Sequence, residues 1–320
     1  MRRILQFQIP EDRADSLLID FLLQRFPYLS REGWLDRIAQ GRVLINGAAT
    51  DAHCRLACND VMESLVDDIP EPAVCTDLTI IHEDRDLLVV DKPANLPCHP
   101  GGRYFNHTLW AVVKRECGIA APSIINRLDR ETSGVVIIGK TDDSTRRCRK
   151  QFAERQVEKR YIVLVEGAFP ETLVAQGYLV TDETSSIRKK RKFVILPEGD
   201  PVPPEGENAT TQFKRVALHG EISEVEAYPE TGRSHQIRAT LQSLGFPVVG
   251  DKLYGVEPAM FLRFCTDALT EEDRLRLRMD RQALHAARLR LRHPRTHQPV
   301  EFAAPLPADM AECIARWRTH

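Results

Sequence analysis

A polar turn that leads directly into an apolar run is the feature that most restricts how this chain can fold. Residues 126–134 read Asn-Arg-Leu-Asp-Arg-Glu-Thr-Ser-Gly, and residues 135–138 are two valines followed by two isoleucines. Four β-branched residues in succession predict a buried strand with the polar turn at its mouth. Asp129 is close in sequence to Arg127 and Arg130. The turn is therefore either an Asx-capped turn with solvated arginines or part of a functional site.

The length of the chain predicts two domains. Its 320 residues exceed the usual size of one domain. Residues 67–72 are acidic and contain prolines, which is typical of a domain boundary. We therefore expect a small domain over residues 1–70 and a larger one over residues 71–320. Strand candidates outnumber long helices in the larger domain, so we expect it to be a sheet-rich α/β (α+β) domain.

Charge and cysteine content exclude some classes of protein. The net charge of -2 argues against a general nucleic-acid coat protein, although basic residues are clustered locally. The 8 cysteines form no CxxC pair, and Cys54 with Cys58 has no matching second pair, so we expect no zinc or other metal. We see no signal segment and no membrane-spanning run, and we expect reduced thiols in a cytoplasmic protein.

The first 70 residues contain a short pattern with a known counterpart. Ser30 is a good N-cap for a helix that ends at Gly41, and a strand over 42–45 then enters an Asn-Gly turn. This order resembles the small αL RNA-binding domain, although many unrelated small domains share it. The resemblance implies phosphate contacts by three basic side chains, which are Arg31, Arg37 and Arg42.

Five blocks in the larger domain resemble, in order and spacing, the RluA-type pseudouridine synthases. The match spans roughly residues 78–305, and Ser234 begins a predicted helix within it that ends at Gly245. The five blocks are Arg127-Leu128-Asp129 with Thr132-Ser133-Gly134, Lys159-Arg160-Tyr161, residues 231–238 (TGRSHQIR), residues 250–255 (GDKLYG), and Leu284-His285-Ala286 with His293-Pro294.

The resemblance implies a fold and a reaction. The fold is a mixed, largely antiparallel sheet, and the reaction converts uridine to pseudouridine in folded RNA. That conversion breaks the N1–C1′ bond, turns the uracil over and joins C5 to C1′. It needs a carboxylate, either as a nucleophile at C1′ or as a base at C2′. The resemblance assigns this role to Asp129 and makes Arg238 its ion-pair partner, which would keep the carboxylate charged.

Three further side chains receive roles from the same resemblance. Tyr161 would stack on the flipped uracil and take the C5 proton, although a core aromatic residue is the alternative interpretation. Arg127 would enter the RNA helix where the target base leaves, and Ile237 would form part of the pocket wall. We expect His235 and His285 to be structural histidines.

One residue departs from the family pattern. Members commonly have His directly before Arg-Leu-Asp, whereas this chain has Asn126. Asn keeps hydrogen-bonding capacity but cannot titrate near neutral pH. This puts in doubt a mechanism that uses the histidine as an acid or a base, but it leaves the role of Asp129 unaffected.

The expected partner is RNA, and no cofactor is expected. The chain has no Walker or Rossmann glycine loop, which disfavours a nucleotide-using enzyme. We expect ribosomal RNA as the substrate and transfer RNA as the runner-up, with no DNA, no membrane and a monomeric protein. The rival hypothesis is a non-catalytic RNA-binding or ribosome-assembly factor. Retention of Asp129, Tyr161 and Arg238 favours the enzyme.

Overall fold

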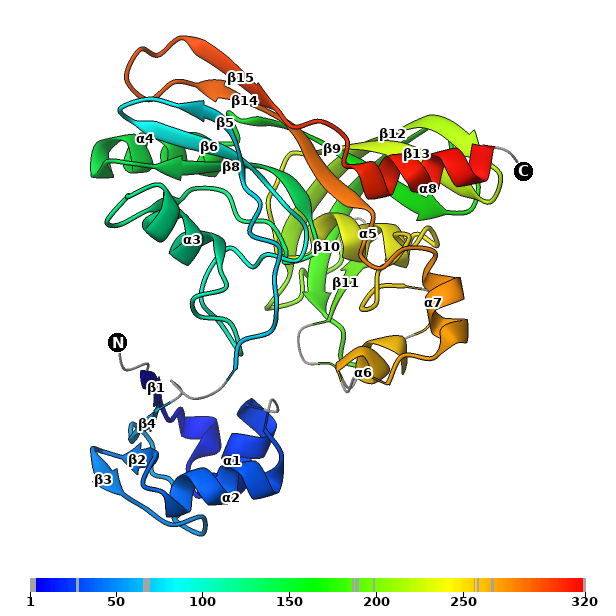
Figure 1. Ribbon diagram of the computed structural model, residues 1–320. Helices are drawn as coiled ribbons and strands as arrows, with labels where there is room; N and C mark the ends of the chain where they lie inside the picture. The colour runs from blue at the N-terminus through cyan, green and yellow to red at the C-terminus, as the bar shows by residue number, and fades with distance from the viewer. Residues whose placement is uncertain are drawn as a thin grey trace. The chain divides into compact units, whose positions relative to one another are not determined.

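The protein forms two compact units in the computed structural model (Figure 1). The first comprises described residues of Met1–Ala73 with Pro100–Asn106, and the second those of Val74–His99 with His107–His320. The predicted boundary at 67–72 lies partly outside the described residues. The structure describes residues 4–26, 29–65, 70–185, 187, 190–197, 199–255, 257, 259–265 and 268–318.

The first unit packs two helices on a small antiparallel sheet with strand order β1-β4-β2-β3. Its core is built from apolar side chains of both helices and of the sheet, with Trp34 among the largest fully buried side chains. Its elements are β1 (Ile4–Gln8), the 3-10 turn η1 (Glu11–Arg13), α1 (Leu18–Arg25), α2 (Arg31–Ala39), β2 (Val43–Ile45), β3 (Ala48–Ala49) and β4 (Val61–Leu65).

Local signals in this unit are confirmed. The Ser30 hydroxyl accepts a hydrogen bond from the Gly33 N–H at 3.1 Å and thereby caps α2. Asn46 and Gly47, with φ of 52° and 77°, form the tight turn between β2 and β3. Positive φ at both central residues explains why this turn uses an Asn-Gly pair.

Residues 100–106 belong to the first unit although they lie far along the chain. The Glu71 carboxylate accepts hydrogen bonds from the backbone N–H groups of Phe105 and Asn106 at 2.8 and 3.0 Å. These bonds tie the two segments together within the unit. No local sequence pattern indicated this return of the chain.

The second unit is organised by one 11-stranded sheet, and among the strands that the structure describes only the β8–β14 pair is parallel. The fold class, a mixed and largely antiparallel sheet with helices, is confirmed. Along the sheet the main order is β11-β10-β12-β13-β9-β14-β8-β6-β5, with β15 paired to β14 and β7 to β8. The strands are β5 (Thr79–Glu83), β6 (Leu87–Lys92), β7 (Ser123–Ile124), β8 (Ser133–Gly139), β9 (Glu158–Glu166), β10 (Thr172–Thr181), β11 (Arg191–Val194), β12 (Glu207–His219), β13 (Ile222–Pro229), β14 (Leu284–Arg292) and β15 (Pro299–Ala303).

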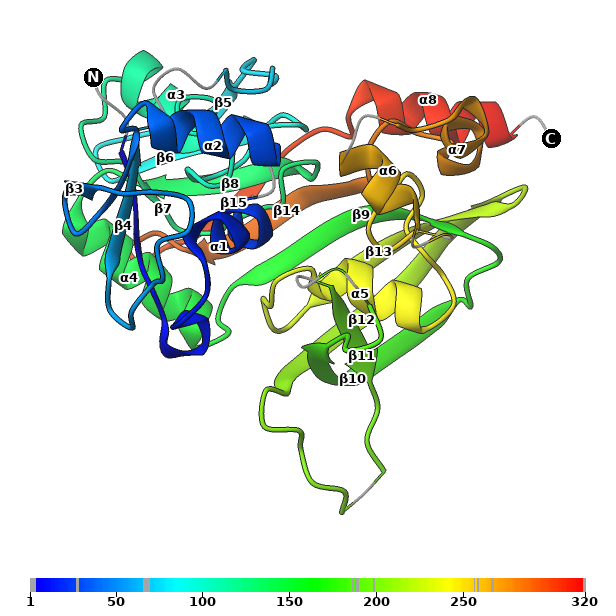
Figure 2. The same ribbon diagram turned by 90° about the horizontal axis from the view of Figure 1, so that it is seen from below.

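Helices cover both ends of this sheet. α5 lies beside β10 and β11, and β9 and β14 run side by side through the middle of the unit (Figures 1 and 2). α5 and α8 contribute to one core cluster together with β9, β10, β12 and β13. The helices are α3 (Leu109–Glu116), α4 (Asp142–Ala153), α5 (Gln236–Ser243), α6 (Ala259–Cys265), α7 (Glu271–Leu277) and α8 (Ala308–Arg318).

The two apolar runs of the sequence became strands that are buried on both faces. All seven residues of β8 are buried, as are the four apolar residues of β6. Alternate side chains of these strands join different cores, one containing α3 and the other containing α4 and β15. Such double burial explains a continuous apolar run in place of alternation. No helix among the described residues is long and apolar enough to cross a bilayer.

Candidate active site

The loop that carries Asp129 is tied to β8 by the side chain of Asn126. The Asn126 amide donates to the Val135 carbonyl at 3.0 Å and accepts from the Ile137 N–H at 2.8 Å. The side chain therefore takes the place of a neighbouring strand at the start of β8. Both bonds are made by a neutral amide, so a titratable histidine is not needed to hold the loop.

Ser133 and Gly134, at the start of β8, are small residues, and β14 approaches them closely. Gly134 has a φ of +115°, and a Cβ atom at this position would lie 2.3 Å from the Ala286 carbonyl oxygen. Only glycine fits both constraints. Beside it, the Ser133 hydroxyl bonds Nδ1 of His285 at 2.9 Å, while Nε2 of His285 faces the Ala304 carbonyl at 3.3 Å. The expectation of a structural histidine is confirmed for the fully buried His285.

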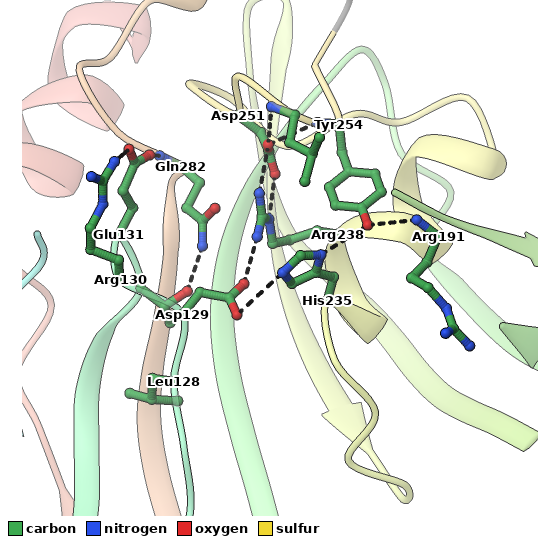
Figure 3. Close-up of polar contacts among 12 residues, drawn as sticks. Leu128, Asp129, Arg130, Glu131, Arg191, His235, Arg238, Asp251, Tyr254 and Gln282 are labelled. Atoms are coloured by element: carbon green, nitrogen blue, oxygen red, sulfur yellow. Dashed lines mark hydrogen bonds and ion pairs between the residues drawn. The ribbon is translucent and has the colours of Figure 1, made fainter. Parts of the chain in front are cut away.

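Asp129 and Arg238 line the same pocket, and their side chains point toward each other (Figure 3). The Arg238 guanidinium donates to Oδ2 of Asp129 at 2.6 Å, so the predicted ion pair forms. Asp251 holds the same guanidinium from its other side. Nε of Arg238 donates to Oδ2 of Asp251 at 2.6 Å, and Nη2 donates to Oδ1 at 2.9 Å. Arg238 is 7 % exposed, and two carboxylates compensate its burial.

The charges of this group are set by the shared arginine. Burial acts to raise the pKa of Asp129, but the Arg238 guanidinium and then His235 outweigh it and hold this pKa below its ordinary value. Burial also acts against the charge of Arg238, but Asp251 and Asp129 raise the pKa of the guanidinium. Asp129 is therefore a carboxylate at neutral pH, as either of its two predicted chemical roles requires.

A pocket lies beside Asp129. Its cavity volume is about 90 Å³, and it opens to solvent. All five of the predicted site residues in this unit line it, namely Arg127, Asp129, Tyr161, Ile237 and Arg238. Among the described residues, no carboxylate pairs with the Arg127 guanidinium, which leaves it able to contact a ligand.

Tyr161 enters the pocket from β9 as a protonated phenol. Burial, and next the negative charge of Asp129, raise the pKa of Tyr161 well above its ordinary value. A protonated phenol offers a ring face for stacking and a hydrogen-bond donor. It removes a proton from carbon only after giving up its own, so the stacking role fits this environment more directly than the base role.

The loop before α5 differs from the prediction. Ser234 was expected to cap this helix, but the N-cap position is His235, with a φ of 58° and a ψ of 16°. The Gln236 side chain stabilises the loop by accepting from the Thr231 hydroxyl at 2.7 Å and from the Arg233 N–H at 3.0 Å. His235 is also not remote from the chemistry, because its Nε2 lies 3.8 Å from Oδ1 of Asp129.

The three arginines of the first unit have different environments. Arg31 is exposed and lies 3.6 Å from Asp20, and Arg42 is half-buried. Arg37 is only 7 % exposed and donates a hydrogen bond to the Leu65 carbonyl. The expectation that Arg37 faces phosphates is therefore wrong: this side chain fastens the end of β4 to α2.

Sequence reasoning gave no role to two residues that organise the site. Asp251 holds Arg238, and Lys92 is fully buried with its amine donating to the carbonyls of Pro93, Leu96 and Arg130 at 2.8, 2.9 and 3.3 Å. Burial lowers the pKa of Lys92 to about 8. These bonds connect the loop after β6 to the loop of Asp129. Asp251 lies inside the sequence block at residues 250–255, which was the only available signal for it.

One group of described residues has metal-ligand chemistry, away from Asp129. It consists of Asp84, Asp86 and His293. Asp84 already accepts from His293 at 2.8 Å and from the backbone N–H groups of Asp86 and Leu87, while Asp86 pairs with Arg295. These acids are neutralised within the protein, and we assign no metal to them.

The chain is similar to known proteins in both sequence and fold. The family described as RNA pseudouridylate synthase matches residues 86–243. A protein of Chlorobaculum parvum named an uncharacterized RNA pseudouridine synthase is 34% identical over 93% of this chain and 93% of its own length. The ribosomal large subunit pseudouridine synthase D of Xylella fastidiosa is 32% identical over 98% of this chain and 92% of its own. The solved structure of human RNA pseudouridylate synthase domain containing 1 is 25% identical with a TM-score of 0.57, covering 76% of this chain and 90% of that one.

Proposed function

Because the chain belongs to the RluA-type RNA pseudouridine synthases, we propose that it isomerises uridines of ribosomal RNA with Asp129 as the catalytic carboxylate. Membership confirms the resemblance found in the five sequence blocks, and it makes the protein an isomerase that acts on RNA. The substrate RNA and the catalytic residues are the parts that we propose.

The position of Asp129 is the observation that carries the proposal. It is the one carboxylate among the residues that line the described pocket, and 30 % of its side chain is exposed. Its pKa is held low by a neighbour that is itself anchored by Asp251. A fixed, charged carboxylate in the wall of a pocket suits attack on C1′ of the ribose and equally suits removal of the C2′ proton.

The other pocket residues take roles that follow from where they lie. Tyr161 supplies a ring face and Ile237 an apolar wall for the detached uracil, which has to stay in the pocket while it turns over. Arg127 occupies the space left in the RNA when the target base leaves. Flipping a base costs a few kcal/mol, and a guanidinium that stacks in its place offsets part of this cost.

Ribosomal RNA is preferred as the substrate because of a full-length relative. The Xylella fastidiosa protein, named for the large ribosomal subunit, matches 98% of this chain and therefore includes most of the first unit. Transfer RNA is the alternative substrate. We further propose that the protein acts as a monomer in the cytoplasm.

Mapping of pseudouridine in total RNA tests the choice of substrate. In a strain that lacks this protein, we expect one or more pseudouridines to disappear from ribosomal RNA and to return when the wild-type gene is restored. Restoration with the Asp129→Asn gene is the matched control and should not return them. Loss of pseudouridine from transfer RNA alone would contradict the proposed substrate while leaving the enzyme class intact.

Removal of residues 1–70 should weaken RNA binding without abolishing the chemistry on a short, saturating substrate. Each phosphate contact that is lost should reduce the slope of log affinity against log salt concentration by about 0.7–0.9. The measurement is a salt titration of RNA binding, with circular dichroism to show that the truncated protein is folded.

Point variants in the intact chain sharpen the test of the first unit. Arg31→Gln changes an exposed arginine and should reduce the slope, whereas buried Arg37→Gln should lower stability instead. An unchanged slope in both the truncated protein and Arg31→Gln would remove the RNA-binding role from this unit.

A further inference from the structure

Tyr254 contacts both His235 and Arg238, the two side chains that flank the carboxylate of Asp129. Its side chain is fully buried behind the pocket, and its hydroxyl lies 3.0 Å from Nδ1 of His235. Its ring face lies 5.0 Å from the guanidinium carbon of Arg238. Its backbone N–H donates at 2.9 Å to Asp251, the other partner of Arg238. A single tyrosine therefore touches His235, Arg238 and Asp251, the second carboxylate that holds Arg238 (Figure 3).

The hydrogen bonds around the phenol define the orientation of His235. The backbone N–H of Arg191, at the start of β11, donates to the Tyr254 oxygen at 3.0 Å. The phenol can donate its hydrogen to Nδ1 of His235 when the imidazole is neutral and carries its hydrogen on Nε2. Nε2 faces Oδ1 of Asp129 at 3.8 Å. Oδ2 is occupied by Arg238, so each carboxylate oxygen has its own cationic or donor neighbour.

The backbone of His235 shows that this orientation is imposed by its surroundings. Its φ of 58° and ψ of 16° lie in the left-handed region, which residues other than glycine rarely adopt. Strained backbone persists only where surrounding contacts enforce it, and it is frequent at functional sites. Here the phenol of Tyr254 and the loop fixed by Gln236 are the enforcing contacts.

We propose that Tyr254 is a positioning residue for pseudouridine formation: its hydroxyl turns His235 toward Oδ1 of Asp129 while its ring supports Arg238 on Oδ2. This inference rests on the proposed role of Asp129. It assigns a function to the tyrosine of the sequence block at 250–255 and to a histidine expected from sequence to be merely structural. The carboxylate is thereby held in one orientation before the nucleotide arrives.

Tyr254→Phe tests the hydroxyl alone, because phenylalanine keeps the ring face beneath Arg238. We expect kcat to fall by about 10- to 100-fold, the cost typical of misplacing a catalytic group, with KM for RNA nearly unchanged. We also expect the acid limb of the pH–rate profile to move to higher pH, since a misoriented His235 stabilises the charged carboxylate less. Three other groups that face Asp129 are left in place by this substitution, namely Arg238 of α5, Lys92 at the end of β6 and Tyr161 of β9.

Tyr228→Phe is the matched control. Its phenol, on β13, donates to Glu226 at 2.5 Å and does not line the pocket, so the same chemical change should leave kcat and the pH profile unaltered. In a His235→Ala background, Tyr254→Phe should cause little further loss of kcat, because the histidine that its hydroxyl orients is already absent.

Several outcomes separate positioning from mere structure. The inference is overturned if Tyr254→Phe has the kcat of the wild type. It is also overturned if kcat falls while the acid limb of the pH–rate profile does not move and the loss adds fully to that of His235→Ala. A wild-type protein that forms no pseudouridine in ribosomal RNA, or an active Asp129→Asn variant, would instead refute the proposed function, so the two failures are distinguishable.

Discussion

Replacement of Asp129 by Asn should abolish pseudouridine formation while leaving the fold and RNA binding largely intact. Asn has the shape of Asp but is neither a nucleophile nor a base. The rate should therefore fall by more than about 10²-fold, the smallest contribution typical of a positioned acid or base. The fold should survive because Arg238 keeps the two hydrogen bonds to its other carboxylate, Asp251. No buried charge is left without a partner.

The measurement is pseudouridine formation on a ribosomal RNA fragment, together with RNA affinity and the urea midpoint of unfolding. Lys214→Gln, which changes an exposed residue of β12 outside the pocket, provides a control for charge substitution in the same preparation. If purified Asp129→Asn protein forms pseudouridine at a rate comparable with wild type, Asp129 is not the catalytic carboxylate.

Local sequence patterns predicted the elements of the sheet better than they predicted the helix starts. The β-branched run at 135–138 became β8. The sequence also predicts paired strands over residues 210–218 and 221–228, and these are β12 and β13. By contrast, the sequence predicts Asp143 or Ser144 as the cap of the helix that follows β8, whereas α4 is capped by Thr141 in a capping box with Ser144 as its second member. Several polar residues in succession can each cap a helix, and tertiary contacts decide among them.

Burial of Arg37 was readable from helix periodicity, whereas the role of Asp251 was not. Arg37 lies three residues after Trp34 and next to Ile38, both of which are buried on the inner face of α2, so its position on the core side follows from the helical repeat. Asp251 and Asp129 are 122 residues apart in sequence. Only the folded chain brings both onto one guanidinium, and no local pattern encodes such a meeting.

The pocket was predicted in its residues but not in its geometry. The family resemblance paired Asp129 with Arg238 across 109 positions, and the structure places them 2.6 Å apart. The left-handed backbone of His235 has no sequence signature, because non-glycine residues in this region are rare and are enforced by tertiary contacts. That conformation is what brings a histidine near the carboxylate.

Replacement of Arg238 should have a second large effect, and Met should be worse than Lys. Arg238 neutralises the buried carboxylate of Asp251 and the partly buried one of Asp129, so Arg238→Met leaves both without their counter-charge. Breaking a buried pair by removing one partner costs on the order of 3–5 kcal/mol. We expect Arg238→Met to lower the urea midpoint as well as the rate. Lysine restores the charge but cannot reach both carboxylates with a planar fork, so some activity should survive.

The pH profile separates the electrostatic role of Arg238 from its structural role. Arg238 holds the pKa of Asp129 below its ordinary value, and burial acts in the opposite direction. Without the guanidinium, burial prevails and the pKa of Asp129 rises. Protonation of the carboxylate then inactivates the enzyme at higher pH than in the wild type, so the acid limb of kcat/KM should move to higher pH in Arg238→Met and less in Arg238→Lys.

The control for Arg238 is Asp251→Asn, which removes the second carboxylate and leaves the contact with Asp129. In this variant the acid limb of the pH–rate profile should stay at the low pH of the wild type, because the guanidinium still faces Asp129 and has no other charge to neutralise. We expect both Arg238→Met and Asp251→Asn to be less stable than the wild type. We expect the acid limb to move to higher pH only in Arg238→Met. An Arg238→Met protein with full activity and an unmoved acid limb would mean that the ion pair between Arg238 and Asp129 has no part in the chemistry.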